Sequence, residues 1–139
     1  MTKRQRVPAA VVLFVALLTP VSAQDSPPPP KEPFKAVHVL NLKSDADLAA
    51  LVAWMTEANA IVAKMGVRDT KYRLYKVAGQ QAGAFAYLLE SAWSGGDAYE
   101  KTHKSADFQA LQNKHPKMAT ILANDNQIYN RYVEVPLKK

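Results

Sequence analysis

One stretch in the second half of the chain, residues 91–111 (SAWSGGDAYEKTHKSADFQAL), holds the side chains best suited to chemistry. It contains Trp93, Tyr99, His103 and Phe108. A histidine among aromatic rings can act as a general base, because its ordinary pKa lies close to neutral pH. We therefore take His103 as the candidate catalytic residue. A structural role stays open, in which His103 bonds to backbone at a helix break and the three aromatic rings anchor a core.

Further polar and aromatic side chains lie on segments that would flank this stretch. The candidate ligand-binding residues are His38, Asn41, Arg73, Tyr87, Trp93, Tyr99, Phe108 and Gln112. Glu90 and Arg131 are additional polar residues that could face a cavity. The alternative for Arg73, Glu90 and Arg131 is a set of ion pairs at the surface or at a dimer interface.

We expect three of these residues to converge on one pocket. Asn41 lies at the end of the first predicted strand, and Trp93 ends the third. These two strands are neighbours in the fold predicted below, and His103 follows Trp93 across a strand-turn-helix corner. Gln112 or His115 would join them from the later helix.

The composition excludes several kinds of site. The chain has no Cys, which rules out disulfides, thiol catalysis and thiolate metal ligands. Its three histidines lack the H-x₃-H or H-E-x-x-H spacing of zinc sites, so we predict no metal site. We expect no cofactor, with heme as the alternative considered below.

The N-terminus is typical of a secretory signal peptide. Residues 1–23 have a basic start, an apolar run of 12 residues at 7–18, and small residues before position 24. We predict cleavage after residue 23, a periplasmic or secreted protein, and no membrane association after cleavage. Residues 24–34 are rich in proline and are expected to form an extended linker. The folded domain would then span residues 35–139.

The remaining sequence predicts four strands and two helical regions. Strands are expected at 36–42, 71–78, 84–93 and 128–135, with a glycine-bounded loop at 79–83. Residues 44–66 have a helical stripe made of Leu48, Leu51, Val52, Met55, Ala58, Val62 and Met65. The second helical region, from Asp97, changes its apolar face at Ser105, which can cap a new helix. A further short helical stretch follows at 116–123.

This order, β-α-β-β-α-β, predicts an α+β ferredoxin-like sandwich with a four-stranded antiparallel sheet. Both faces of the sheet would be apolar, and helices cover only one. A second copy of the chain is the simplest cover for the other face, so we predict a homodimer. The same topology occurs in RNA-binding domains, but His38 stands where an aromatic residue is usual and export separates the chain from RNA. We therefore expect no nucleic-acid partner.

The fold and the stretch around Trp93, Ala98-Tyr99, His103, Ser105 and Phe108 resemble the dimeric α/β-barrel superfamily, especially antibiotic-biosynthesis-monooxygenase (ABM)-like domains. The resemblance covers roughly residues 36–135. It implies a pocket between helices and sheet and, in some members, cofactor-independent oxygenation. Members with other activities, or none known, share the fold, so the resemblance is specific for fold rather than chemistry.

The resemblance also raises heme as an alternative ligand. Heme-degrading members of this superfamily use an asparagine on the first strand, a tryptophan ending the third and a histidine ligand on the second helix. Asn41 and Trp93 match the first two. At the ligand position this chain has Gln112, with His115 one turn further on and His103 on the preceding helix.

Three functions therefore follow from the sequence. The leading hypothesis is an exported homodimer that binds a small apolar or aromatic molecule and acts, if it is an enzyme, as a monooxygenase-like protein. The first alternative is a structural or interaction module without catalysis. The second is a heme-binding or heme-degrading protein.

Overall fold

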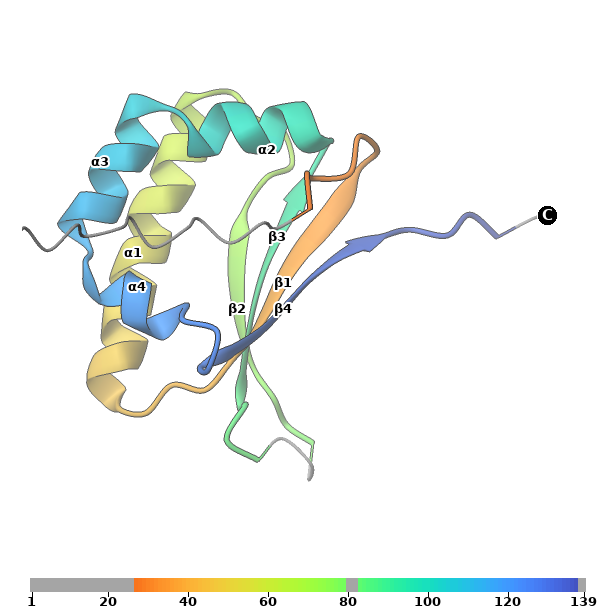
Figure 1. Ribbon diagram of the computed structural model, residues 1–139. Coiled ribbons are helices and arrows are strands. Elements are labelled where there is room, and N and C mark those ends of the chain that lie inside the picture. Colours follow the sequence, from red (N-terminus) through yellow and green to blue (C-terminus); the bar gives the residue numbers. More distant parts are fainter. Residues whose placement is uncertain (1–26, 80–82, 138–139) are drawn as a thin grey trace, which may run out of the picture.

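The computed structural model describes residues 27–79 and 83–137 of the chain. The expected signal peptide (1–23), the first residues of the proline-rich segment and the tip of the 79–83 loop lie outside the described residues. The elements follow the predicted order, with the second helical region in three pieces (Figure 1): β1 Phe34–Leu40, α1 Asp45–Lys64, β2 Tyr72–Lys76, β3 Tyr87–Trp93, α2 Gly96–His103, α3 Ala106–Lys114, α4 Lys117–Ile121 and β4 Gln127–Val133.

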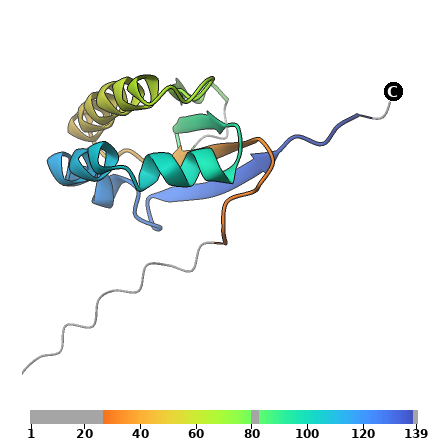
Figure 2. The ribbon, with the colours of Figure 1, turned by 90° about the horizontal axis from the view of Figure 1, so that it is seen from above.

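The four strands form one antiparallel sheet in the order β2-β3-β1-β4. The helices lie on one face of this sheet, and in the described part of the chain the opposite face has no helix (Figures 1 and 2). This is the ferredoxin-like α+β arrangement, and the predicted fold class is confirmed. The first and third strands are neighbours, as expected, with Phe34 opposite Trp93 and Leu40 opposite Tyr87.

Helix α1 begins where the sequence predicts a cap. The Ser44 side chain accepts a hydrogen bond from the backbone N–H of Asp47, and Gly66 follows the helix with a φ of +66°. The buried residues are Leu51, Trp54, Ala58 and Val62. By length and composition α1 could span a membrane, but these four residues pack in the core.

The predicted apolar stripe of this helix needs one correction. Val52, which the periodicity placed on it, is 47% exposed, whereas Trp54 is buried. The large indole fills the space over the sheet, and Val52 is turned toward solvent.

Ser105 separates α2 from α3, which confirms the predicted break. Its hydroxyl donates to the Thr102 carbonyl at 2.7 Å, at the end of α2, and accepts from the Phe108 N–H at 3.2 Å, in the first turn of α3. One hydroxyl therefore adds a second hydrogen bond to a carbonyl at the end of one helix, which also accepts from the Ser105 N–H, and satisfies a free N–H of the next helix. The change of direction lets both Tyr99 and Phe108 face the core, although they lie on opposite sides of a straight helix.

The core lies between the sheet and the helices. Its buried apolar residues are Phe34, Ala36, Leu40, Leu51, Trp54, Ala58, Val62, Tyr72, Leu89, Trp93, Phe108, Leu111, Met118 and Ile121. On the sheet's other face, alternation along the strands places Val37, Val39, Tyr75, Leu88, Ile128 and Tyr132. Ile128 and Tyr132 are 51% and 52% exposed. That face, here called the bare face, is therefore rich in exposed apolar side chains, and no helix of the described residues covers it.

The proline-rich segment is not a free linker where the structure describes it. Strand β1 begins at Phe34, and residues 27–33 run back against the folded domain. Arg131 donates to the carbonyl of Pro27 at 2.6 Å. The backbone of Pro30 and Lys31 lies directly on Gly95 and Gly96, at the start of α2.

Candidate functional site

A cavity of about 160 Å³ lies between the sheet and the helices. The sheet lines it with Ala36, His38, Tyr72, Leu89 and Ser91. The helical side lines it with Trp54, Tyr99, His103, Phe108, Gln112 and Leu122. The cavity thus collects two of the chain's three histidines, and it includes five of the nine residues that the sequence proposed for the site.

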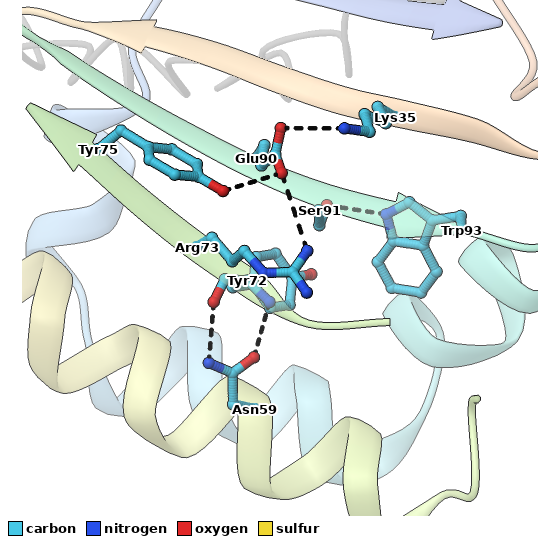
Figure 3. A network of polar contacts seen from close by, with 8 residues as sticks. All are labelled: Lys35, Asn59, Tyr72, Arg73, Tyr75, Glu90, Ser91 and Trp93. Atoms are coloured by element: carbon cyan, nitrogen blue, oxygen red, sulfur yellow. Dashed lines mark hydrogen bonds and ion pairs between the residues drawn. The ribbon is translucent and has the colours of Figure 1, made fainter. Parts of the chain in front are cut away.

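The aromatic residues of the 91–111 stretch pack together beside this cavity, which Tyr99, His103 and Phe108 line and Trp93 does not. The His103 ring stacks on Tyr99 with 3.9 Å between centroids and lies 5.3 Å from Trp93 and 4.6 Å from Phe108. Trp93 donates from Nε1 to Ser91 Oγ at 2.8 Å, which fixes the indole (Figure 3). The structure therefore brings Trp93, Tyr99, His103 and Phe108 together.

The orientation of His103 follows from its hydrogen bond. Nδ1 lies 2.8 Å from the carbonyl oxygen of Tyr99, and a carbonyl only accepts, so Nδ1 bears the proton. The neutral ring then presents an unprotonated Nε2. Burial is the main cause of a lowered pKa for His103, to which electrostatic repulsion from Arg131 and from protonated His38 adds, while the bond to Tyr99 opposes them. The ring is therefore neutral at neutral pH, and Nε2 is available as a base.

His38 is held in the same state by a different partner. Its Nδ1 lies 2.6 Å from Oε1 of Gln127. The Gln127 amide nitrogen donates to the Leu122 carbonyl, which leaves Oε1 to accept from His38. Burial lowers the pKa of His38, although the bond to Gln127 raises it in part. The ring stacks on Tyr129 at 4.4 Å. His38 is therefore a second neutral imidazole, because of its burial, and among the described residues its Nε2 has no hydrogen-bond partner.

Two residues that line the cavity carry buried donors without partners. Within the described residues, the Trp54 Nε1–H and the Tyr72 hydroxyl have no hydrogen-bond partner, although these residues are only 3% and 5% exposed. Burial strongly raises the pKa of Tyr72, so its hydroxyl remains a donor. An unpaired buried donor costs about 1–3 kcal/mol, so two of them on residues lining one cavity are an unusual arrangement for a simple core.

Tyr72 is fixed by a residue of α1. The Asn59 side chain accepts from the Tyr72 N–H at 2.7 Å and donates to the Tyr72 carbonyl at 3.1 Å (Figure 3). The Tyr72 ring also meets Trp54 edge-on at 5.0 Å. Helix α1 therefore sets the position of both unpaired donors.

The expected convergence of Asn41 with Trp93 and His103 is wrong. Strands β1 and β3 are neighbours but antiparallel, so Trp93 lies opposite Phe34. Asn41 is seven residues further along, roughly 23 Å away at 3.3 Å per residue. Tyr87 lies opposite Leu40, at the same distant end, and packs against the core there. Neither residue lines the cavity.

Arg73 is also not on this cavity. It lies on the bare face of the sheet, 3.8 Å from Glu90. Glu90 is 3.6 Å from Lys35 and accepts from the Tyr75 hydroxyl at 3.2 Å (Figure 3). Side chains alternate between the two faces along a strand, and those of Arg73 and Glu90 point away from the helices. The alternative of an ion pair at the surface therefore describes these two residues.

Of the two residues expected from the later helix, only Gln112 lines the cavity. His115 instead lies 3.1 Å from Glu57, on the outer side of the helices. No group of three or more His, Asp or Glu suited to a metal ion occurs among residues 27–79 and 83–137.

Sequence reasoning missed Trp54, Tyr72 and Ser91 as cavity residues. Trp54 and Tyr72 read as ordinary core side chains, and nothing local shows that their donors lack partners. The one available signal was that Trp54 is a large side chain with a polar N–H on the buried face of α1, since such a group usually needs a hydrogen-bond partner.

Comparisons with known proteins support the fold. No protein-family model matches the sequence, and no curated protein matches it. A dimeric ferredoxin-like protein of unknown function from Jannaschia sp. CCS1 is 10% identical, with a TM-score of 0.56 over 74% of this chain and 99% of that one. A protein from Caulobacter crescentus CB15, described provisionally as an antibiotic biosynthesis monooxygenase, is 16% identical, with a TM-score of 0.54 over 76% and 92%.

A hydroxynitrile lyase from Passiflora edulis is equally similar, at 11% identity and a TM-score of 0.54 over 79% of this chain and 100% of that one. These proteins differ in described activity, so the shared fold does not fix the chemistry. The chain has the ferredoxin-like fold of ABM-like and related proteins, as the resemblance of its sequence predicted.

Proposed function

We propose that this chain is an exported domain that binds a small hydroxylated aromatic molecule in the cavity around His103. The observation that supports this most directly is the pair of unpaired donors, Tyr72 OH and Trp54 Nε1, on residues that line the same cavity as two neutral imidazoles. A ligand oxygen that accepts from Tyr72 or Trp54 and donates to a histidine Nε2 would satisfy both kinds of group.

The size of the cavity limits the ligand to about one ring. An apolar cavity of about 150 Å³ accommodates benzene, and this one measures about 160 Å³. The aromatic walls offer edge and face contacts to such a ring. A four-ring heme is too large for this space, and Gln112 stands at the expected ligand position. We therefore propose no heme in this cavity.

The chemistry that these residues can perform is proton removal. His103 Nε2 accepts the proton of a phenolic hydroxyl: the O–H bond breaks, an N–H bond forms, and the oxygen keeps the electron pair. The donors of Tyr72 and Trp54 then stabilise the phenolate oxygen. Oxygenation of such an electron-rich anion would further require dioxygen as co-substrate.

The domain is proposed to work as a homodimer. Its bare sheet face exposes Ile128 and Tyr132 beside Val37 and Val39, and apolar patches of this kind are usually interaction surfaces. The similar protein from Jannaschia is described as dimeric. A second copy would cover the face and leave the cavity on the helical side of each sheet.

Calorimetry with phenol and toluene tests the binding proposal, with Tyr72→Phe as the variant and Tyr75→Phe, on the opposite sheet face, as the control. Phenol should bind the original protein. Its binding to Tyr72→Phe should be weaker by about 1 kcal/mol, which is somewhat under a tenfold increase in Kd. Toluene, which lacks the hydroxyl, should bind both equally. Phenol affinity that is absent, or unchanged by Tyr72→Phe, contradicts the proposal.

Deprotonation is tested with 4-nitrophenol, whose anion absorbs visible light. Near neutral pH the protein should increase the anion absorbance, and His103→Asn should abolish the increase. Asparagine can still donate to the Tyr99 carbonyl but has no basic nitrogen, so the fold is expected to persist. An increase that survives in His103→Asn would exclude His103 as the base.

A further inference from the structure

The proline-rich segment 27–33, here called the strap, lies against the domain at two points. At its N-terminal end the Pro27 carbonyl accepts from Arg131 Nη1 at 2.6 Å. Further along, its backbone covers Gly95 and Gly96, where α2 begins. A Cβ added to Gly96 would lie 2.8 Å from the Pro30 carbonyl oxygen and 3.1 Å from that of Pro29. Glycine is therefore required there for the strap to dock.

Arg131 lies between the strap and the wall of the cavity. Its guanidinium carbon is 5.3 Å from the Tyr99 ring centroid and 5.5 Å from that of Tyr129. Its Nε donates to the Tyr129 hydroxyl at 2.9 Å. The same side chain thus contacts both tyrosines and, through Nη1, the strap.

Each of these tyrosines stacks on one of the two cavity histidines. Tyr99 lies against His103 at 3.9 Å, and Tyr129 lies against His38 at 4.4 Å. A continuous set of contacts therefore leads from the strap through Arg131 and the tyrosines to both imidazoles. Figure 2 shows the strap crossing the β4 side of the molecule, next to α2.

We infer that the strap closes the β4 side of the cavity and that Arg131 is the latch holding it over Tyr99 and Tyr129. Releasing the strap frees Arg131 and loosens both tyrosines, which opens a route to His38 and His103. Its prolines favour this use, because they restrict the free segment and reduce the entropy lost on docking. A role in admitting ligand rests on the proposed function, whereas closure of the cavity does not.

The test measures how fast diethyl pyrocarbonate acylates each histidine, with peptide mass spectrometry as the readout. Gly96→Ala is the main variant, because its added Cβ displaces the strap backbone while alanine suits a helix better than glycine. Gly79→Ala is the matched control, since a Cβ there meets nothing within 4 Å. His115, which lies beside Glu57 away from the strap, serves as the internal reference.

Relative to His115, both His38 and His103 should react severalfold faster in Gly96→Ala than in the original protein or in Gly79→Ala. Arg131→Met removes the latch without touching the glycines and should give the same increase, so it replaces Gly96→Ala if that variant does not fold. Unchanged reactivity of both histidines in the folded variants overturns the inference.

Phenol binding, measured on the same proteins, separates this inference from the proposed function. Faster acylation without any phenol binding supports the strap and contradicts the proposed ligand. Phenol binding with unchanged acylation supports the ligand and contradicts the strap.

Discussion

His103 and Tyr99 contact each other twice: the His103 Nδ1 donates to the Tyr99 carbonyl at 2.8 Å, and the two rings stack at 3.9 Å. Both contacts come from adjacent turns of α2, because residues four apart share a helix face. One turn of helix thus fixes the tautomer of the imidazole and the plane of its ring. The structural and catalytic roles considered for His103 are therefore compatible, since the bond to backbone leaves Nε2 free.

We predict that acidification destabilises the protein through its two buried histidines. Burial lowers the pKa of His38 and His103 below the ordinary value of 6.5, so the unfolded chain binds more protons as pH falls. The contribution of the two neutral histidines to the free energy of unfolding is complete above pH 6.5 and is lost as the pH falls toward their lowered pKa values. Urea unfolding at about pH 7.5 and about pH 5 measures the loss. A His38→Asn/His103→Asn double variant should lose less; an equal loss would contradict this account.

Ser105→Ala is predicted to destabilise the protein by about 1–2 kcal/mol, because α3 loses its N-cap and α2 loses a donor to its last turn. Ser44→Ala is the comparison, since Ser44 caps only α1. Thermal unfolding should show a larger loss for Ser105→Ala. A smaller loss than that of Ser44→Ala would show that the bond to Thr102 adds no stability.

Trp93→Ala should cost about 3–5 kcal/mol, as expected for removing a buried aromatic side chain. Trp93 is 3% exposed and contacts Tyr72, Tyr99 and His103. Trp93→Phe keeps a ring and loses the bond to Ser91, so its cost should be clearly smaller. Chemical denaturation of the two variants gives the comparison, and equal losses would mean that the Ser91 bond, not the ring, holds the site.

Ile128→Lys is predicted to convert the proposed dimer into a monomer, because it places a charge on the bare sheet face. Val52→Lys is the control, as Val52 is similarly exposed, 47% against 51%, but lies on α1. Sedimentation at micromolar concentration distinguishes the two outcomes. Dimers in both variants, or a monomeric original protein, would contradict a homodimer formed through this face.

The elements of this fold could be predicted because their signals are local. Ser105 combines a capping residue with a change of apolar face, so the break between α2 and α3 was visible without the tertiary structure. Strand ends were predicted less accurately. Strand β3 begins at Tyr87 rather than three residues earlier, because no turn residue separates the apolar residues of the strand from those of the preceding loop.

The site could be predicted only in part, because its geometry depends on register and on unpaired atoms. The prediction that β1 and β3 are neighbours was correct. Because the two strands are antiparallel, however, Asn41 lies at the end of the sheet opposite to Trp93. The unpaired state of Tyr72 and Trp54 depends on every neighbour of the cavity. The docking of prolines on Gly95 and Gly96 is likewise a contact between distant segments, which composition cannot reveal.

The paired hydrogen bonds between Asn59 and Tyr72 also bear on what the sheet can join. Strand β2 is an edge of the sheet, and an edge strand presents backbone groups that can recruit another chain into cross-strand aggregation. Here a carboxamide occupies both backbone groups of Tyr72, much as a neighbouring strand would. An incoming strand would have to displace it, so this single side chain protects the β2 edge against sheet extension, and Asn59→Ala should aggregate sooner than the original protein.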